Sequence, residues 1–418
     1  MSQPDTGTRS APPDTSAGTE SLPRRLWLIV LLGALAAIAP MTTDMYLPAL
    51  PEMPADLSTG TMQIQLTLTA NVVGLAAGQA IAGPLSDTFG RRRPLLIGMA
   101  AFAVVSLLCV FAPTVEALIA LRLVQGATGA AGIVIGRAIV RDRYDGVAAA
   151  KFFAALMLVN GLAPILAPVV GGQLLRVVPW PGVFAVLSAF GALLLLGVLF
   201  GLRETLPRDA RATGGVRATL GTFRGLLADR VFLGYALTLG LSFAAMFTYI
   251  SGSSFVLQDI YDMSAQTYSL VFGANAVGIV VAGQVSGRLA GRVPLERILY
   301  AGLGIATAGG AALVAGALAG GGLAIVLPAL FLVVAAQGLI LPNATALGLS
   351  GRPPGVAGSA SALLGVAQFG LGGAAAPLAG LGGSGTAVPM AVSIGALMVA
   401  AVLAAAVIAR PRRVASQD

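Results

Sequence analysis

The chain has 418 residues, of which 57% are hydrophobic and only 10% are charged, and its mean hydropathy is +0.89. This composition excludes a water-soluble globular protein and indicates an integral membrane protein. The formal net charge of +8 would favour nucleic acid as a partner of a soluble domain, but the basic residues are dispersed between apolar runs. We therefore expect a lipid bilayer as the surroundings and no nucleic acid.

The first 25 residues are rich in Pro, Ser, Thr and Asp and contain no apolar run. They predict a disordered tail, neither a signal peptide nor a span. The chain has no histidine, and Cys109 is its single cysteine. This excludes imidazole metal sites and an internal disulfide, and we expect no metal and no cofactor.

Twelve apolar runs of about 20 residues follow, each long enough to cross a bilayer as a helix. Six form a first lobe at 26–202 and six form a second lobe at 231–410, with a polar cytoplasmic linker at 203–230 and a tail at 411–418. The expected spans of the first lobe are 26–47, 61–82, 94–112, 116–138, 151–174 and 182–202. Those of the second lobe are 231–252, 266–287, 295–318, 321–344, 356–378 and 388–409.

The loop at 83–94 lies between the second and third spans and carries Arg91, Arg92 and Arg93. Cytoplasmic loops collect arginine, so this loop predicts the cytosolic face and places both termini in the cytosol. With that orientation, Arg176 is the one basic residue on the outer side of the membrane, Arg122 lies within a span, and the other basic residues lie on the cytosolic side.

The two lobes contain related segments. The sequence at 70–74 resembles that at 274–278, and Gly83, Ser86, Arg92 and Pro94 recur as Gly283, Ser286, Arg292 and Pro294. Internal repeats of this kind are typical of transporters that rock around a central site.

The loop fits the pattern Gly83-x-x-x-Asp87-x-x-Gly90-Arg91-Arg92. It resembles the signature between the second and third helices of the major facilitator superfamily. Three further segments, 44–51, 122–126 and 163–172, resemble the Bcr/CflA subfamily of drug:proton antiporters, and the resemblance extends from residue 26 to residue 413.

This resemblance implies an all-α membrane protein of twelve helices in two six-helix lobes. It implies multidrug efflux by alternating access, with protons and a small antibiotic-like drug as the transported partners, and a monomer in the membrane. Abundant Arg, Ala and Gly indicate a GC-rich bacterial genome, and hence the bacterial inner membrane.

In the loop, we expect Asp87 to lie against the free amide groups that begin the helix near 355–360, and Arg91 to pair with Asp142. By resemblance, these residues with Gly83, Gly90 and Arg92 form a cytoplasmic gate. The alternative is a solvated charge cluster that only sets the topology.

Asp44 and Arg122 are the consequential charges within spans. Arg122 lies about six residues, or about 9 Å, from the outer end of its helix, and Asp44 lies at a similar depth. Both should face the interior, where the two can pair. Burial disfavours the ionised form of a carboxylate, whereas a neighbouring guanidinium favours it. Asp44 can therefore change its protonation state, and we expect it to carry the proton while Arg122, which stays charged, modulates it. The alternative is a fixed interhelical ion pair.

The fifth span carries two prolines and two glycines, Pro164, Pro168, Gly171 and Gly172. They predict a bent helix that packs closely, against the span at 266–287 with its Gly278, Gly283 and Gly287. Their role as an antiporter motif is implied by the resemblance, and simple packing is the alternative.

Candidate substrate contacts are polar or aromatic residues within spans, which tend to face the interior or an apolar ligand. They are Asn71, Asn275, Phe243, Met246, Phe247 and Gln368, with Gln65 and Phe369 as further additions. An aromatic stripe at helical spacing is also common in plain packing.

The sequence therefore predicts proton-coupled efflux of a drug, with export or symport of a small metabolite as the alternative. We find no phosphate-binding loop and no carboxylate dyad within the spans, and expect no enzyme. With one membrane carboxylate, we expect neutral substrates rather than dications.

Overall fold

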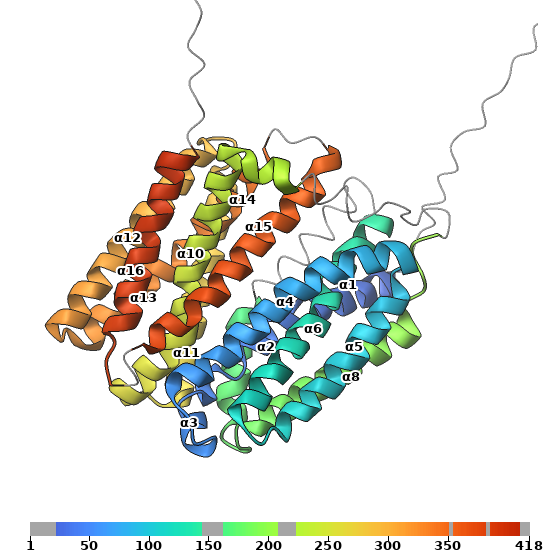
Figure 1. The fold of residues 1–418 in the computed structure, drawn as a ribbon, viewed down its shortest axis with the longest axis horizontal. Helices are drawn as coiled ribbons and strands as arrows, with labels where there is room; N and C mark the ends of the chain where they lie inside the picture. Colours follow the sequence, from blue (N-terminus) through green and yellow to red (C-terminus); the bar gives the residue numbers. More distant parts are fainter. Residues whose placement is uncertain (1–21, 144–161, 208–222, 351–353, 382–384, 410–418) are drawn as a thin grey trace, which may run out of the picture.

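Two lobes of long helices lie side by side in this computed structural model (Figure 1), which describes residues 22–143, 162–207, 223–350, 354–381 and 385–409. The helices of the first lobe are α1 (Leu22–Ala36), α2 (Ile38–Asp44), η1 (Leu47–Ala49), α3 (Met53–Asp56), α4 (Thr61–Phe89), α5 (Arg92–Val110), α6 (Val115–Arg143), an unlabelled helix at Leu162–Leu174 and α8 (Pro181–Gly201). Those of the second lobe are α10 (Arg230–Phe255), η3 (Val256–Ile260), α11 (Ala265–Leu289), α12 (Leu295–Ala319), α13 (Gly322–Ala335), α14 (Gln337–Leu349), α15 (Pro354–Ala375), η4 (Ala376–Gly380), α16 (Val388–Leu403) and η5 (Ala404–Ile408).

The predicted spans are confirmed wherever the structure describes them. Eleven stretches are long and apolar enough to cross a membrane, and the shorter apolar helix Leu162–Leu174 falls in the fifth predicted span. The first eleven residues expected of that span, 151–161, lie outside the described residues. The all-helical fold in two lobes follows from the length and spacing of these runs.

Local chemistry fixes the two breaks that matter for the site. Gly90 has a φ of 89° and ends α4, so the chain turns at once into α5. Glycine reaches this region without steric cost, which explains the tight loop. The first span is interrupted at Ala37, between α1 and α2, and Pro40 lacks the N–H that a continuous helix needs.

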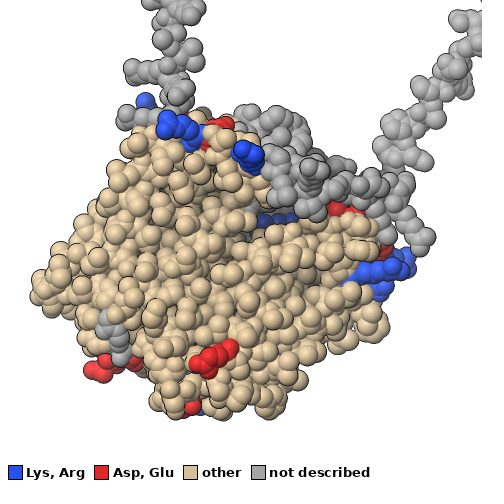
Figure 2. Space-filling view, viewed as in Figure 1, with Lys and Arg blue, Asp and Glu red and all other residues tan. Residues whose placement is uncertain are grey.

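The two ends of the bundle differ in charge. We call the end that carries the Gly90–Arg93 loop and Arg292 the basic end, and the end that carries η1, α3 and η3 the acidic end. On the face drawn in Figure 2, blue side chains gather near one end and a wide uncharged belt separates them from red side chains at the other. Such a belt is what the hydrocarbon core of a bilayer requires.

The lobes are joined at the acidic end. All four side-chain hydrogen bonds that the structure gives between described residues of the two lobes lie there, and each runs to a backbone carbonyl. They are Gln65 Nε2 to Ser251 O (3.3 Å), Ser254 Oγ to Leu47 O (2.5 Å), Gln258 Nε2 to Pro48 O (3.2 Å) and Gln266 Nε2 to Gly172 O (3.0 Å). We call these four contacts the interlobe seal.

Candidate functional site

A cavity of about 170 Å³ lies between the lobes. The first lobe lines it with Ala39, Pro40, Thr43, Asp44, Val72, Leu75 and Pro164. The second lobe lines it with Phe243, Met246, Phe247, Tyr249, Ile250, Phe272, Asn275, Ala276, Ile279, Val334 and Phe369. The wall is almost entirely apolar, and Asp44 is the one carboxylate among the described residues that line it.

Asp44 is held at the end of α2, directly after the interruption of the first span. The Thr43 hydroxyl donates to Asp44 Oδ1 at 2.7 Å and also reaches the Ala39 carbonyl at 3.0 Å. Only 5% of Asp44 is exposed, yet it lines the cavity. A buried carboxylate that faces a cavity can exchange a proton or meet a ligand there without unfolding of the helix.

The expected contact between Asp44 and Arg122 is wrong for this structure. Arg122 is fully buried, and its Nη2 donates to the Thr42 carbonyl at 2.8 Å while its Nη1 donates to Gln125 Oε1 at 2.5 Å. Its guanidinium lies over the Tyr46 ring, 4.5 Å from the centroid. A backbone carbonyl, an amide and an aromatic face thus take the place of the expected carboxylate, so Arg122 contacts the segment that carries Asp44 and not Asp44 itself.

The candidate substrate residues divide into two groups. Phe243, Met246, Phe247 and Asn275 line the cavity, and so does Phe369. Asn71 and Gln368 do not line it: Asn71 donates to the Arg122 carbonyl at 3.3 Å between α4 and α6, and Gln368 is half-buried on α15. Their role as substrate contacts stays a prediction. Gln65 lies in the interlobe seal.

Tyr249 and Phe272 line the cavity as well and were not predicted. Their rings stack with centroids 5.5 Å apart, and the Tyr249 hydroxyl accepts from Asn275 Nδ2 at 2.9 Å. The signal was present in the sequence, because Phe272 lies three residues before Asn275 and therefore on the same face of α11.

The fifth span packs against α11, as its composition predicts. A Cβ added at Gly171 would lie 1.7 Å from the Met45 carbonyl oxygen, and one added at Gly172 would lie 2.3 Å from Ser269 Oγ. Pro164 lines the cavity. This helix thus touches both the residue after Asp44 and the second lobe.

The expected partners on α11 were wrong. Gly273 is the glycine that faces the fifth span, with Ile165 and Val169 as neighbours. Gly278 faces Phe331 of α13, Gly283 faces Gly338 of α14, and Gly287 has no neighbour within 4 Å among the described residues. Gly278 and Gly283 therefore serve contacts within the second lobe, and none of the three glycines faces the fifth span.

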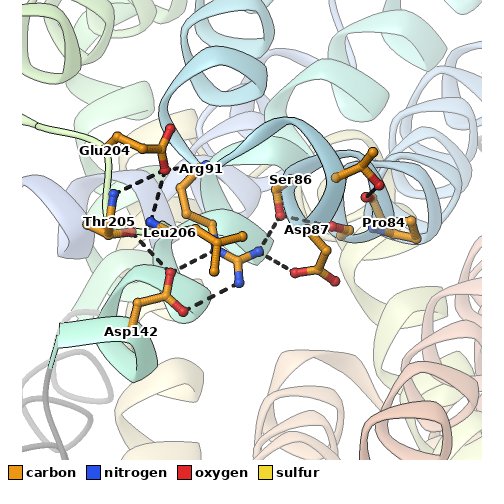
Figure 3. Close-up of polar contacts among 10 residues, drawn as sticks. Pro84, Ser86, Asp87, Arg91, Asp142, Glu204, Thr205 and Leu206 are labelled. Atoms are coloured by element: carbon orange, nitrogen blue, oxygen red, sulfur yellow. Dashed lines mark hydrogen bonds and ion pairs between the residues drawn. The ribbon is translucent and has the colours of Figure 1, made fainter. Parts of the chain in front are cut away.

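The arginine loop at the basic end forms a bonded cluster within the first lobe (Figure 3). The predicted pair of Arg91 and Asp142 is confirmed, with Arg91 Nε donating to Asp142 Oδ2 at 2.8 Å. Arg91 also pairs with Asp87 and donates to Ser86 Oγ at 2.8 Å. The Asp87 side chain is 49% exposed, and the side chains at 355–359, against which it was expected to lie, are outside the description.

Glu204, in the expected linker, was missed as part of this cluster. Its carboxylate accepts from the backbone N–H groups of Arg91 (2.7 Å), Arg92 (3.2 Å), Thr205 (3.0 Å) and Leu206 (3.1 Å). Partial burial raises the pKa of Glu204, but these amides outweigh it and leave the pKa below its ordinary value. The start of the linker therefore anchors the loop as well as connecting the lobes.

Comparison with known proteins decides the family, because residues 32–377 match the Major Facilitator Superfamily. The chain belongs to the Major Facilitator Superfamily. Members are membrane transporters, which in general are not enzymes, and this member is a multi-pass membrane protein.

Two relatives cover most of this superfamily member. It is 41% identical over 368 residues to the uncharacterized MFS-type transporter YdgK of Bacillus subtilis (strain 168), covering 88% of this chain and 91% of that protein. It is 32% identical over 376 residues to the bicyclomycin resistance protein homolog of Haemophilus influenzae, covering 90% and 94%.

A solved structure shares the fold. The bacterial homologue of the human lysosomal transporter Spinster, in an inward-facing and unoccupied conformation, matches with a TM-score of 0.71 and 17% identity, covering 93% of this chain and 96% of that one. The two-lobed arrangement is therefore that of the superfamily.

Proposed function

We propose that this superfamily member is a secondary transporter that exports small, largely apolar antibiotic-like molecules in exchange for protons. The observation that carries this proposal is that both lobes line one aromatic cavity, in which Asp44 is the one carboxylate among the described residues. A carboxylate there can hold either a proton or a polar group of the substrate, and rocking of the lobes would expose it to each side in turn. The similarity to a bicyclomycin resistance protein homolog supports a drug as the substrate.

In this proposal Asp44 carries the proton, and Arg122 acts through the backbone of α2 that it holds at Thr42. The cytoplasmic gate consists of the Arg91 cluster, in which Arg91 binds Asp87 and Asp142, together with Gly83, Gly90 and Arg92. The fifth span, with its two prolines and two glycines, closes the cavity against proton leak. Both termini lie in the cytosol of a bacterial cell, and the transporter works as a monomer in the inner membrane.

With that orientation, the interlobe seal closes the outer side. Four uncharged hydrogen bonds hold the lobes together there, while Asp87 at the opposite end remains half exposed. The structure then corresponds to a state that receives substrate from the cytosol, which is the side from which an exporter must load.

The test uses purified protein in proteoliposomes with an imposed proton gradient. Asp44→Asn should abolish drug-stimulated proton movement while the protein remains folded, because the amide cannot take up and release a proton. Asp259→Asn, at an exposed acid of the same end of the bundle, is the matched control and should transport normally. Undiminished coupling in Asp44→Asn would overturn the proposal.

A further inference from the structure

The two walls of the cavity differ in chemistry. The second lobe supplies packed aromatic rings: Phe243 and Phe369 meet edge to face with centroids 5.3 Å apart, and Phe243 and Phe247 stack at 5.9 Å. The polar side chains of the second-lobe wall, Asn275 and Tyr249, are bonded to each other. The first lobe supplies Asp44 and Thr43 among apolar side chains. A ligand that fits this cavity therefore places an aromatic or apolar body on the second lobe and its polar end on the first.

The polar end faces an uncompensated carboxylate. Among the described residues no arginine lies within ion-pair distance of Asp44, and Arg122 is occupied by Thr42, Gln125 and the Tyr46 ring. A buried charge is costly unless it is paired. When Asp44 is ionised, a cation on the ligand is the partner that the described residues do not provide.

The carboxylate also offers more hydrogen-bond acceptors than its neighbours use. An ionised carboxylate has about four lone-pair sites, and among the described residues Asp44 has one donor, the Thr43 hydroxyl. N–H groups on a cation would form charge-assisted hydrogen bonds, which are about twice as strong as neutral ones. A quaternary ammonium group carries charge without N–H donors, and a neutral amide carries an N–H donor without charge.

The size of the cavity limits the body of the ligand. Its volume of about 170 Å³ is below the roughly 300 to 1,000 Å³ of pockets that hold drug-sized molecules. In this state the cavity suits a single ring on a short chain.

We propose that the cavity selects a protonated amine carried on a one-ring aromatic body, with the ammonium on Asp44 and the ring against Phe243, Phe247 and Phe369. This rests on the proposed function, because it assigns the substrate class of the same site. It replaces the expectation of neutral substrates rather than dications, which was based on the presence of one membrane carboxylate without a second.

The test compares three probes with one body: 4-phenylbutylamine, its N,N,N-trimethyl derivative and its N-acetyl derivative. Calorimetric binding to the full-length protein in lipid nanodiscs should rank the amine first, at least tenfold tighter than the amide, with the quaternary ammonium between them. Asp44→Asn should remove the preference for the amine, and Phe247→Ala should weaken all three probes alike. Asp259→Asn should leave all three affinities unchanged.

Equal affinity for amine and amide in the wild type, or a preference that survives Asp44→Asn, would overturn the ligand class. Unchanged binding of the amide to Asp44→Asn shows that the variant is folded, so loss of the preference then supports the proposal. Transport assays separate the two proposals: proton-coupled export of the amide as fast as the amine rejects the ligand class alone, whereas coupling that is indifferent to Asp44→Asn rejects the exporter.

Discussion

The interlobe seal gives a prediction that can be worked from the structure. Ser254→Ala combined with Gln258→Ala removes the bonds to the carbonyls of Leu47 and Pro48, two of the four side-chain hydrogen bonds that the structure gives between described residues of the two lobes. A net uncharged hydrogen bond contributes about 1 kcal/mol. The double variant should therefore destabilise the closed acidic end by about 2 kcal/mol, or about 30-fold in population. Leu47 and Pro48 are both buried. The Leu47 carbonyl keeps the backbone N–H of Leu50 at 3.2 Å, whereas the Pro48 carbonyl loses its side-chain donor in buried surroundings, which adds to the effect.

Spin labels measure this shift directly. Phe111→Cys at the end of α5 and Leu318→Cys at the end of α12 lie on different lobes at the acidic end, and both positions are exposed. The buried Cys109 does not compete for the label. The double variant should move the distance distribution toward longer separations. Ser188→Ala is the matched control, because it removes a bond to the Ala103 carbonyl within one lobe. A distribution unchanged by the double variant would show that these bonds do not hold the end closed.

Three further outcomes are expected. Glu204→Gln should increase the hydrogen exchange of the loop amides several-fold. The pKa of Glu204 is lowered from 4.5 in the folded protein, so the stability that its carboxylate contributes is complete above pH 4.5 and is lost as the pH falls through the lowered pKa. Amide protection that is the same at neutral and acidic pH would contradict this. Gly171→Ala should lower the free energy of unfolding by about 1–3 kcal/mol, because the added Cβ would overlap the Met45 carbonyl, and its melting temperature should fall. Gly287→Ala is the control: its Cβ would enter open space, so it should melt like the wild type. Arg122→Lys keeps the charge but loses the guanidinium geometry that binds both the Thr42 carbonyl of α2 and Gln125. Proton-driven transport should therefore fall about tenfold, while binding of the neutral amide probe persists. Full transport would remove Arg122 from the proposed mechanism.

The spans and part of the cavity wall could be predicted because they depend on properties that a sequence displays directly. Apolar length determines which segments cross the membrane, and a stripe such as Phe243 and Phe247 at helical spacing must share one face. The position of Asp44, near the end of the first span, also determined its depth. These features need no knowledge of how the helices rotate against one another.

Rotation and distant pairing were beyond the same reasoning. Counting residues placed Asp44 and Arg122 at equal depth, but depth does not determine azimuth, and Arg122 instead faces the Thr42 carbonyl. Asn71 and Asn275 occupy equivalent places in the repeat, yet one binds the backbone of α6 and the other binds Tyr249. Glu204 lies 113 residues from Arg91, and no local pattern connects them.

In the proposed mechanism, the divergence of the two lobes would allow one carboxylate to serve both the ligand and the proton. The first lobe holds Asp44, Arg122 and the Arg91 cluster, whereas the second lobe has Gly287 in the place of Asp87 and supplies the aromatic wall. A charged ligand end and a proton would therefore meet the same lobe, and the ligand body would meet the other. Because the ligand must bridge both lobes to use both walls, its binding energy is available only when the lobes adopt the spacing that the cavity requires. A ligand that contacted one lobe alone would bind every conformation equally and could not drive exchange.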